Sequence, residues 1–232
     1  MSVHPSPDHL STSPTSVVSA LNERRFHREK HIAGCDDLSS NLSLGLEEFL
    51  HALPNTIHSA HSDLGHCDGE TDPIAALFRR LDVNRSEWDR FEFFDSSRNY
   101  TRNLISTDGD TYTLILLCWN AGKESPIHDH PCDGCYMRVL EGSIRESRYF
   151  RNENEDKLDC TADEIFKEGD LAFIKDSIGY HKIGNPTKDI PAVTMHLYSP
   201  PFQRCQIWPD PSHASRSSSA SMCYYSEYGR LM

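Results

Sequence analysis

The sequence predicts a mainly β domain, a sandwich or barrel, preceded by a few short helices. From Tyr100 onward, short runs of β-branched and apolar residues alternate with turn residues. Residues 43–95 instead carry apolar residues at helical spacing. Residues 1–42 are rich in Ser, Pro, His and charge, which predicts a disordered N-terminal extension with one short helix near Val17–Arg25. We therefore expect a single domain over 43–232, with a helical part (43–95) and a β-barrel (96–232).

Three segments of the helical part have recognisable signals. Apolar residues recur at helical spacing in Leu44–Leu53, and Pro73–Leu81 follows Asp72, a suitable N-cap. A third short helix is expected over Asn84–Arg90, and the segment His58–Glu70 is expected to be a loop.

The expected strands are short. Glu141-Gly142-Ser143 separates two of them and indicates a hairpin. A sharp turn at Ser199-Pro200-Pro201 favours a cis peptide bond. The strands are predicted at Thr111–Trp119, Tyr136–Leu140, Ile144–Phe150, Leu171–Ile174, Ala192–Tyr198 and Met222–Tyr228, and the segment Pro209–Ser221 is expected to be a loop.

The charge and the N-terminus exclude several classes of partner. The formal net charge of -12 argues against nucleic acid and against anionic membranes, both of which attract Lys and Arg. The first residues show neither the basic start nor the apolar run of a signal peptide, and no stretch approaches the roughly 20 apolar residues of a membrane span. We expect a cytoplasmic monomer whose eight cysteines stay reduced.

His128-Asp129-His130 is the first feature that indicates chemistry. On a strand, alternate side chains share a face, so these two imidazoles could chelate one metal ion. Gly122, Cys135 and Gly142 flank the pair, and Gly169, His181 and Asn185 follow. This spacing resembles the two-part signature of the cupins, small β-barrels that hold a metal inside.

One departure from the cupin signature matters chemically. Cys135 stands where the signature has a glutamate ligand, so the predicted ligands are three neutral imidazoles: His128, His130 and His181. Imidazole suits iron, zinc, copper and nickel alike, so the ligand type leaves the metal open. A site without a carboxylate keeps the full charge of the ion, which suits an anionic thiolate substrate.

From about Leu44 to the C-terminus, the chain resembles cysteine dioxygenase. The segments that carry the resemblance fall in the family's order: Tyr100-Thr-Arg-Asn-Leu104, Leu117-Cys-Trp119, Ile127-His-Asp-His130, Asp176-Ser-Ile-Gly179 with His181, and His196-Leu-Tyr-Ser-Pro-Pro-Phe202. The resemblance implies one Fe(2+) per chain on the three histidines, and conversion of L-cysteine and dioxygen to cysteine sulfinic acid.

The resemblance also implies roles for five further residues. Arg102 would hold the substrate carboxylate, because a planar guanidinium binds a carboxylate in bidentate fashion, and Tyr100 would line the same pocket. Tyr198 would lie over the iron, joined to Cys135 by a thioether and hydrogen-bonded by His196; Thr194 stands where the family often has serine.

Two other functions stay open at this point. One is a dioxygenase of another small thiol, such as 3-mercaptopropionate or cysteamine, and Arg102 disfavours cysteamine because that thiol has no carboxylate. The other is a metal-binding cupin without enzyme activity.

Overall fold

The computed structural model describes residues 42–62 and 72–232, so the expected N-terminal extension and its helix near Val17–Arg25 lie outside the described residues. Three α-helices come first in these ranges: α1 (Leu46–Ser62), α2 (Pro73–Arg80) and α3 (Arg85–Trp88). Asp72 caps α2 as expected, since its carboxylate accepts the backbone N–H of Ile74 at 2.8 Å.

Helix α1 is longer than predicted. The expected loop is wrong for 58–62, where the helix continues to Ser62, and the rest of that loop falls outside the described residues. Thr56 and Ser59 fit the helix because each hydroxyl donates to a carbonyl one turn back. The apolar face of α1 is almost fully buried, at Leu46, Phe49, Leu53 and Ile57.

The described strands begin at Tyr100, and their prediction as a mainly β fold is confirmed. They are β1 (Tyr100–Thr107), β2 (Thr113–Trp119), β3 (Ile127–His128), β4 (Gly134–Glu141), β5 (Ser143–Arg151), β6 (Leu158–Lys167), β7 (Leu171–Ile174), β8 (Tyr180–Gly184), β9 (Ala192–Ser199), β10 (Arg204–Trp208), β11 (Ser218–Ser221), β12 (Ser226–Glu227) and β13 (Arg230–Leu231).

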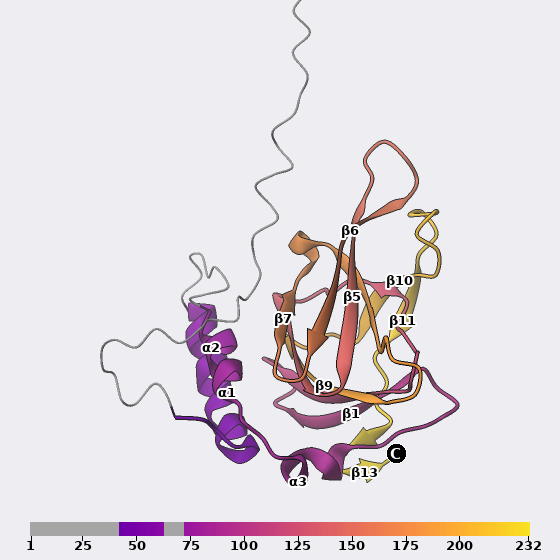
Figure 1. Ribbon diagram of the computed structural model, residues 1–232. Coiled ribbons are helices and arrows are strands. Elements are labelled where there is room, and N and C mark those ends of the chain that lie inside the picture. Colours follow the sequence, from indigo (N-terminus) through magenta and orange to yellow (C-terminus); the bar gives the residue numbers. More distant parts are fainter. Residues whose placement is uncertain (1–41, 63–71) are drawn as a thin grey trace, which may run out of the picture. The chain divides into compact units, whose positions relative to one another are not determined.

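The strands form two sheets. The larger has the order β13-β12-β1-β2-β9-β4-β7, and the smaller has the order β11-β10-β3-β8-β5-β6. From β3 to β10 the chain crosses repeatedly from one sheet to the other, as in a jelly roll. In Figure 1, β5 and β6 of the smaller sheet stand upright, and β9 and β1 of the larger sheet cross below them. The main apolar core takes buried side chains from both sheets, including Leu117, Ile144 and Ile183.

The turns and the C-terminal segment agree only in part with the predicted elements: the loop expected over Pro209–Ser221 is wrong for 218–221, which form β11. Gly142 links β4 and β5 with a φ of 79°, which accounts for glycine at this hairpin. The Ser199–Pro200 bond is cis, as expected. The single strand predicted over Met222–Tyr228 is wrong: β11 ends before it, and the two-residue β12 pairs in parallel with β1. The pairings of β12 with β1 and with β13 each join two residues of a strand, so sequence periodicity could not resolve them.

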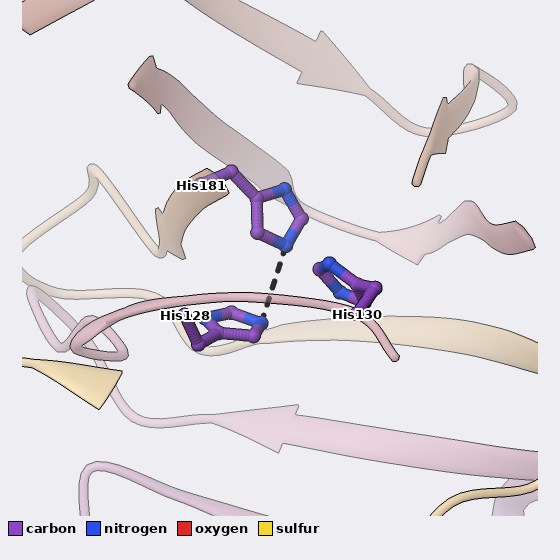
Figure 2. A group of neighbouring side chains, drawn as sticks. All are labelled: His128, His130 and His181. Carbon is purple, nitrogen blue, oxygen red and sulfur yellow. Dashed lines mark hydrogen bonds between the residues drawn. The ribbon is translucent and has the colours of Figure 1, made fainter. Parts of the chain in front are cut away.

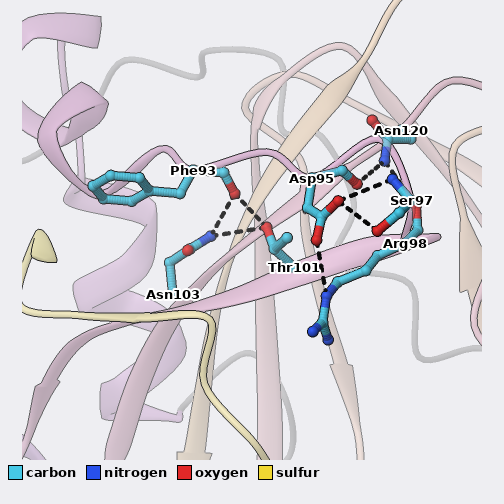
Figure 3. A network of polar contacts seen from close by, with 7 residues as sticks. All are labelled: Phe93, Asp95, Ser97, Arg98, Thr101, Asn103 and Asn120. Carbon is cyan, nitrogen blue, oxygen red and sulfur yellow. Dashed lines mark hydrogen bonds and ion pairs between the residues drawn. The ribbon is translucent and has the colours of Figure 1, made fainter. Parts of the chain in front are cut away.

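A polar network fixes the start of β1, the strand that carries Tyr100 and Arg102 (Figure 3). The carbonyl of Phe93 accepts hydrogen bonds from Thr101 and Asn103. The Asn120 amide donates to the Asp95 and Arg98 carbonyls, each at 2.8 Å. These bonds tie the segment before β1 to the end of β2, so the first residues of β1 have a defined position.

Candidate metal centre

The three predicted histidines lie together between the sheets (Figure 2). His128 ends β3, His181 lies opposite it on β8, and His130 follows β3 in the chain. Their candidate ligand atoms all lie within 4.8 Å of one another, and the Nε2 atoms of His128 and His181 are 3.2 Å apart. Two nitrogens at that separation can both reach an ion placed about 2.1 Å from each.

The hydrogen bonds of the rings show why a cation fits between them. Nδ1 of His128 faces the Pro126 carbonyl at 3.0 Å, and Nδ1 of His181 faces the Glu146 carboxylate at 2.6 Å. Both partners are acceptors, so each Nδ1 carries the ring proton. The two Nε2 lone pairs then face each other, an arrangement that repels without a positive ion between them and binds one well.

His130 is fixed through its backbone. Its N–H donates to Oδ1 of Asp176 at 2.6 Å. Its ring atom Nδ1 is buried and has no hydrogen-bond partner among the residues that the structure describes. A buried imidazole nitrogen without a partner is costly, and a metal ion is one group that would satisfy it.

Burial keeps all three rings in the form that binds metal. It lowers the pKa of His128 to about 4, and it lowers the pKa of His130 and His181 well below the usual value. At neutral pH the three imidazoles are therefore uncharged. The donor set fits a divalent transition metal, as the sequence predicted.

The predicted substrate-binding residues line the same cavity as the histidines. Arg102 donates from Nη2 to the Tyr100 hydroxyl at 2.8 Å, and its guanidinium lies over the Tyr100 ring at 4.9 Å. The Tyr100 ring in turn packs on Trp119, with ring centroids 4.4 Å apart. The cavity therefore combines three neutral imidazoles with one guanidinium, a combination that suits an anionic ligand with a metal-binding group.

The three remaining predicted residues meet on β4 and β9. Cys135 and Tyr198 are directly opposed in the register of these strands, and both side chains are buried. His196 lies 4.0 Å from the Cys135 sulfur through Nδ1 and 2.8 Å from the Thr194 hydroxyl through Nε2. Burial raises the pKa of both Cys135 and Tyr198, so both keep their protons at neutral pH.

The residues of the candidate site come from both sheets. His128 and His181 belong to the smaller sheet, whereas Arg102, Cys135 and Tyr198 belong to the larger one. The site therefore depends on how the two sheets pack.

Three residues of the site were not predicted from the sequence. Glu146 contacts His181, Asp176 holds the His130 backbone, and the Trp119 indole donates to Thr194 at 2.9 Å. The alternation Ile144, Glu146 on a strand could have indicated an inward-facing carboxylate. Trp119 and Asp176 fall in segments already singled out, but their partners are distant in sequence.

Fold and site together define a cupin-type β-barrel protein with a three-histidine candidate metal centre. Comparison with known proteins narrows this class. Cysteine dioxygenase type I, a protein family, matches residues 55–210. The chain belongs to the cysteine dioxygenase type I family, which confirms the predicted resemblance and the prediction of an enzyme, a dioxygenase.

Two relatives at the sequence level agree with this assignment. Cysteine dioxygenase type 1 of Bos taurus is 31% identical over 178 residues, 76% of this chain and 88% of that protein. The Homo sapiens protein of the same name is 29% identical with the same coverage. A solved double-stranded β-helix protein from Klebsiella pneumoniae has a TM-score of 0.38 at 18% identity, covering 48% of this chain and 80% of that one. Separately, no helix within 42–62 and 72–232 is long and apolar enough to span a membrane.

Proposed function

We propose that the chain holds one ferrous ion on His128, His130 and His181 and converts L-cysteine and dioxygen to cysteine sulfinic acid. Both oxygen atoms end on sulfur, so the thiol and one dioxygen account for every atom of the product. The single observation that carries the choice of substrate is Arg102, which lines the same cavity as the histidines. A ferrous ion bound there would supply a common binding point for the substrate thiolate and dioxygen.

The chain's own residues would orient the substrate. The Arg102 guanidinium would bind the carboxylate of cysteine through two parallel N–H donors. Tyr100 supports this role, because its hydroxyl accepts from Nη2 and leaves the other guanidinium donors available. Tyr198 keeps its hydroxyl proton and lines the cavity, so it can donate a hydrogen bond to the reacting oxygen atoms.

We also propose that Cys135 and Tyr198 become joined by a thioether. The opposed register and the burial of both side chains support it. The bond forms between the sulfur and the tyrosine ring with loss of one hydrogen from each, and dioxygen takes up both hydrogens as hydrogen peroxide. His196 and Thr194 would hold the two side chains in place.

The test is sulfinate formation. Protein reconstituted with Fe(2+) without air is mixed with dioxygen and L-cysteine, 3-mercaptopropionate or cysteamine, and sulfinate and oxygen consumption are measured. We expect L-cysteine to give the highest kcat/KM. Bound iron without sulfinate would instead indicate a metal-binding protein, and an equal rate with cysteamine would contradict the carboxylate clamp.

Two variants separate ligand from clamp. His181→Ala should lose iron, so undiminished iron content would contradict the ligand set. Arg102→Gln should raise KM for cysteine about 10- to 150-fold, which corresponds to about 1.5–3 kcal/mol for a charge-assisted bond. The exposed Arg204 offers a control, since Arg204→Gln changes the net charge equally on β10.

A further inference from the structure

A buried carboxylate lies directly behind one predicted metal ligand. Glu146 on β5 is 2% exposed, and its Oε1 lies 2.6 Å from Nδ1 of His181. Its other oxygen, Oε2, accepts a hydrogen bond from Nε of Arg148 at 2.9 Å, and Nη2 of Arg148 forms an ion pair with it at the same distance. Arg148 also reaches the Phe173 carbonyl at 3.5 Å. The pair thus connects His181 to the larger sheet, where Phe173 lies on β7.

Arg148, Glu146 and His181 form a chain of hydrogen bonds in which the donor and the acceptor of each bond are fixed. Arg148 has donors only, and it occupies one oxygen of Glu146. The second oxygen accepts the proton of His181 Nδ1, which leaves the lone pair of Nε2 facing His128. An acceptor behind a histidine ligand fixes its ring orientation and raises its basicity toward the metal.

We infer that Glu146, held by Arg148, is a positioning residue that sets the metal affinity of the three-histidine centre. The inference rests on the proposed metal site and extends it. The carboxylate that the cupin signature places among the ligands is replaced by Cys135, and a carboxylate contributes here through His181 instead. The negative charge of Glu146 would act on the metal through the His181 ring, and it would occupy no coordination position that the substrate needs.

Glu146→Gln tests the inference because a glutamine has one acceptor for two donors. Arg148 competes for the amide oxygen, and the amide NH2 then turns toward Nδ1 of His181. That group can only donate, so the ring proton moves to Nε2 and blocks the ligand atom. We expect Glu146→Gln to weaken Fe(2+) binding about 10- to 100-fold in an anaerobic competition with a chelator.

A double variant separates this effect from a general loss of structure. In Glu146→Gln with Arg148→Met, the amide oxygen is free to face His181, so affinity should recover at least about 5-fold over the single variant. Asp163→Asn is the matched control: it removes a carboxylate on β6 that pairs with an arginine of β5, Arg145, and both side chains are exposed. It should keep the parent affinity.

Several outcomes would overturn the inference. Glu146→Gln within twofold of the parent affinity would exclude a positioning role, and a double variant no tighter than the single one would exclude the part given to Arg148. If Glu146→Gln does not fold, Glu146→Asp decides: it keeps the charge but shortens the reach, and parent-like affinity there would refute the inference. Metal affinity is measured without substrate, so absence of sulfinate would refute the proposed function and leave this result standing.

Discussion

Trp119→Phe tests how the larger sheet orients the His196 ring beside Cys135. The indole N–H can only donate, so the Thr194 hydroxyl accepts there and directs its own proton to Nε2 of His196. His196 then carries its proton on Nδ1, which faces the Cys135 sulfur. Phenylalanine removes the N–H but keeps an aromatic ring against Tyr100.

The size of the effect follows from burial, because Trp119 and Thr194 are both fully buried. The buried Thr194 oxygen, which loses its donor but keeps its bond to His196, should cost about 1–3 kcal/mol of unfolding free energy. Loss of the hydroxyl's control over the His196 ring should remove the net stabilisation of one hydrogen bond, about 0.5–1.5 kcal/mol. If this energy is lost from the transition state, the rate falls roughly 2- to 10-fold. We expect kcat and the rate of thioether formation to fall by that factor, with KM for cysteine unchanged.

The assays are steady-state kinetics and intact mass after turnover, where the thioether lowers the mass by two hydrogens. Trp208→Phe is the matched control, since that indole donates to the Ala214 carbonyl at the same 2.9 Å in a different cluster. It should lose similar stability and still form the thioether at the parent rate. Thioether formation at the parent rate in Trp119→Phe would refute the inferred chain of hydrogen bonds from Trp119 through Thr194 to His196.

Three further predictions concern the thioether, pH and the hairpin. Cys135→Ser should show no mass loss after turnover and keep reduced activity; a mass loss there would assign the thioether to another cysteine. Burial lowers the pKa of His196 to about 3, so between pH 6.5 and 3 only the unfolded chain takes up this proton. Stability of the metal-free protein should therefore fall with falling pH below 6.5, and His196→Gln should reduce the slope by about 1.4 kcal/mol per pH unit; an unchanged slope in denaturant titrations would contradict the buried neutral ring. Gly142→Ala should cost about 1–3 kcal/mol more than Gly109→Ala, because both have positive φ but only at Gly142 would a Cβ meet Pro191 and Ala192; equal losses by thermal unfolding would exclude this crowding.

Local patterns predicted the mainly β fold, and they singled out three histidines that the structure brings together. The spacing around His128 and His130 led to the prediction of a metal site, and the described strands contain most of each predicted run except Met222–Tyr228. Strand alternation does not explain the position of His130, because β3 ends at His128. His130 reaches the site from the segment that follows β3.

The supporting residues could not be predicted in the same way. Glu146, Asp176 and Trp119 act through partners that are 35, 46 and 75 residues away. Nothing in a local pattern says which buried polar group meets which. The pairing follows only when the strands are in register, since Glu146 meets His181 across β5 and β8, and Trp119 meets Thr194 across β2 and β9.

The opposition of Cys135 and Tyr198 has a consequence for the lifetime of the protein. A bond between them would cross-link neighbouring strands of one sheet and close a loop of roughly 60 residues, which by chain entropy alone stabilises by about 4 kcal/mol. Molecules that have turned over substrate would then unfold later than newly made ones. A sample of used protein would show two unfolding transitions on heating. The ratio of their amplitudes would give the fraction of molecules that carry the thioether.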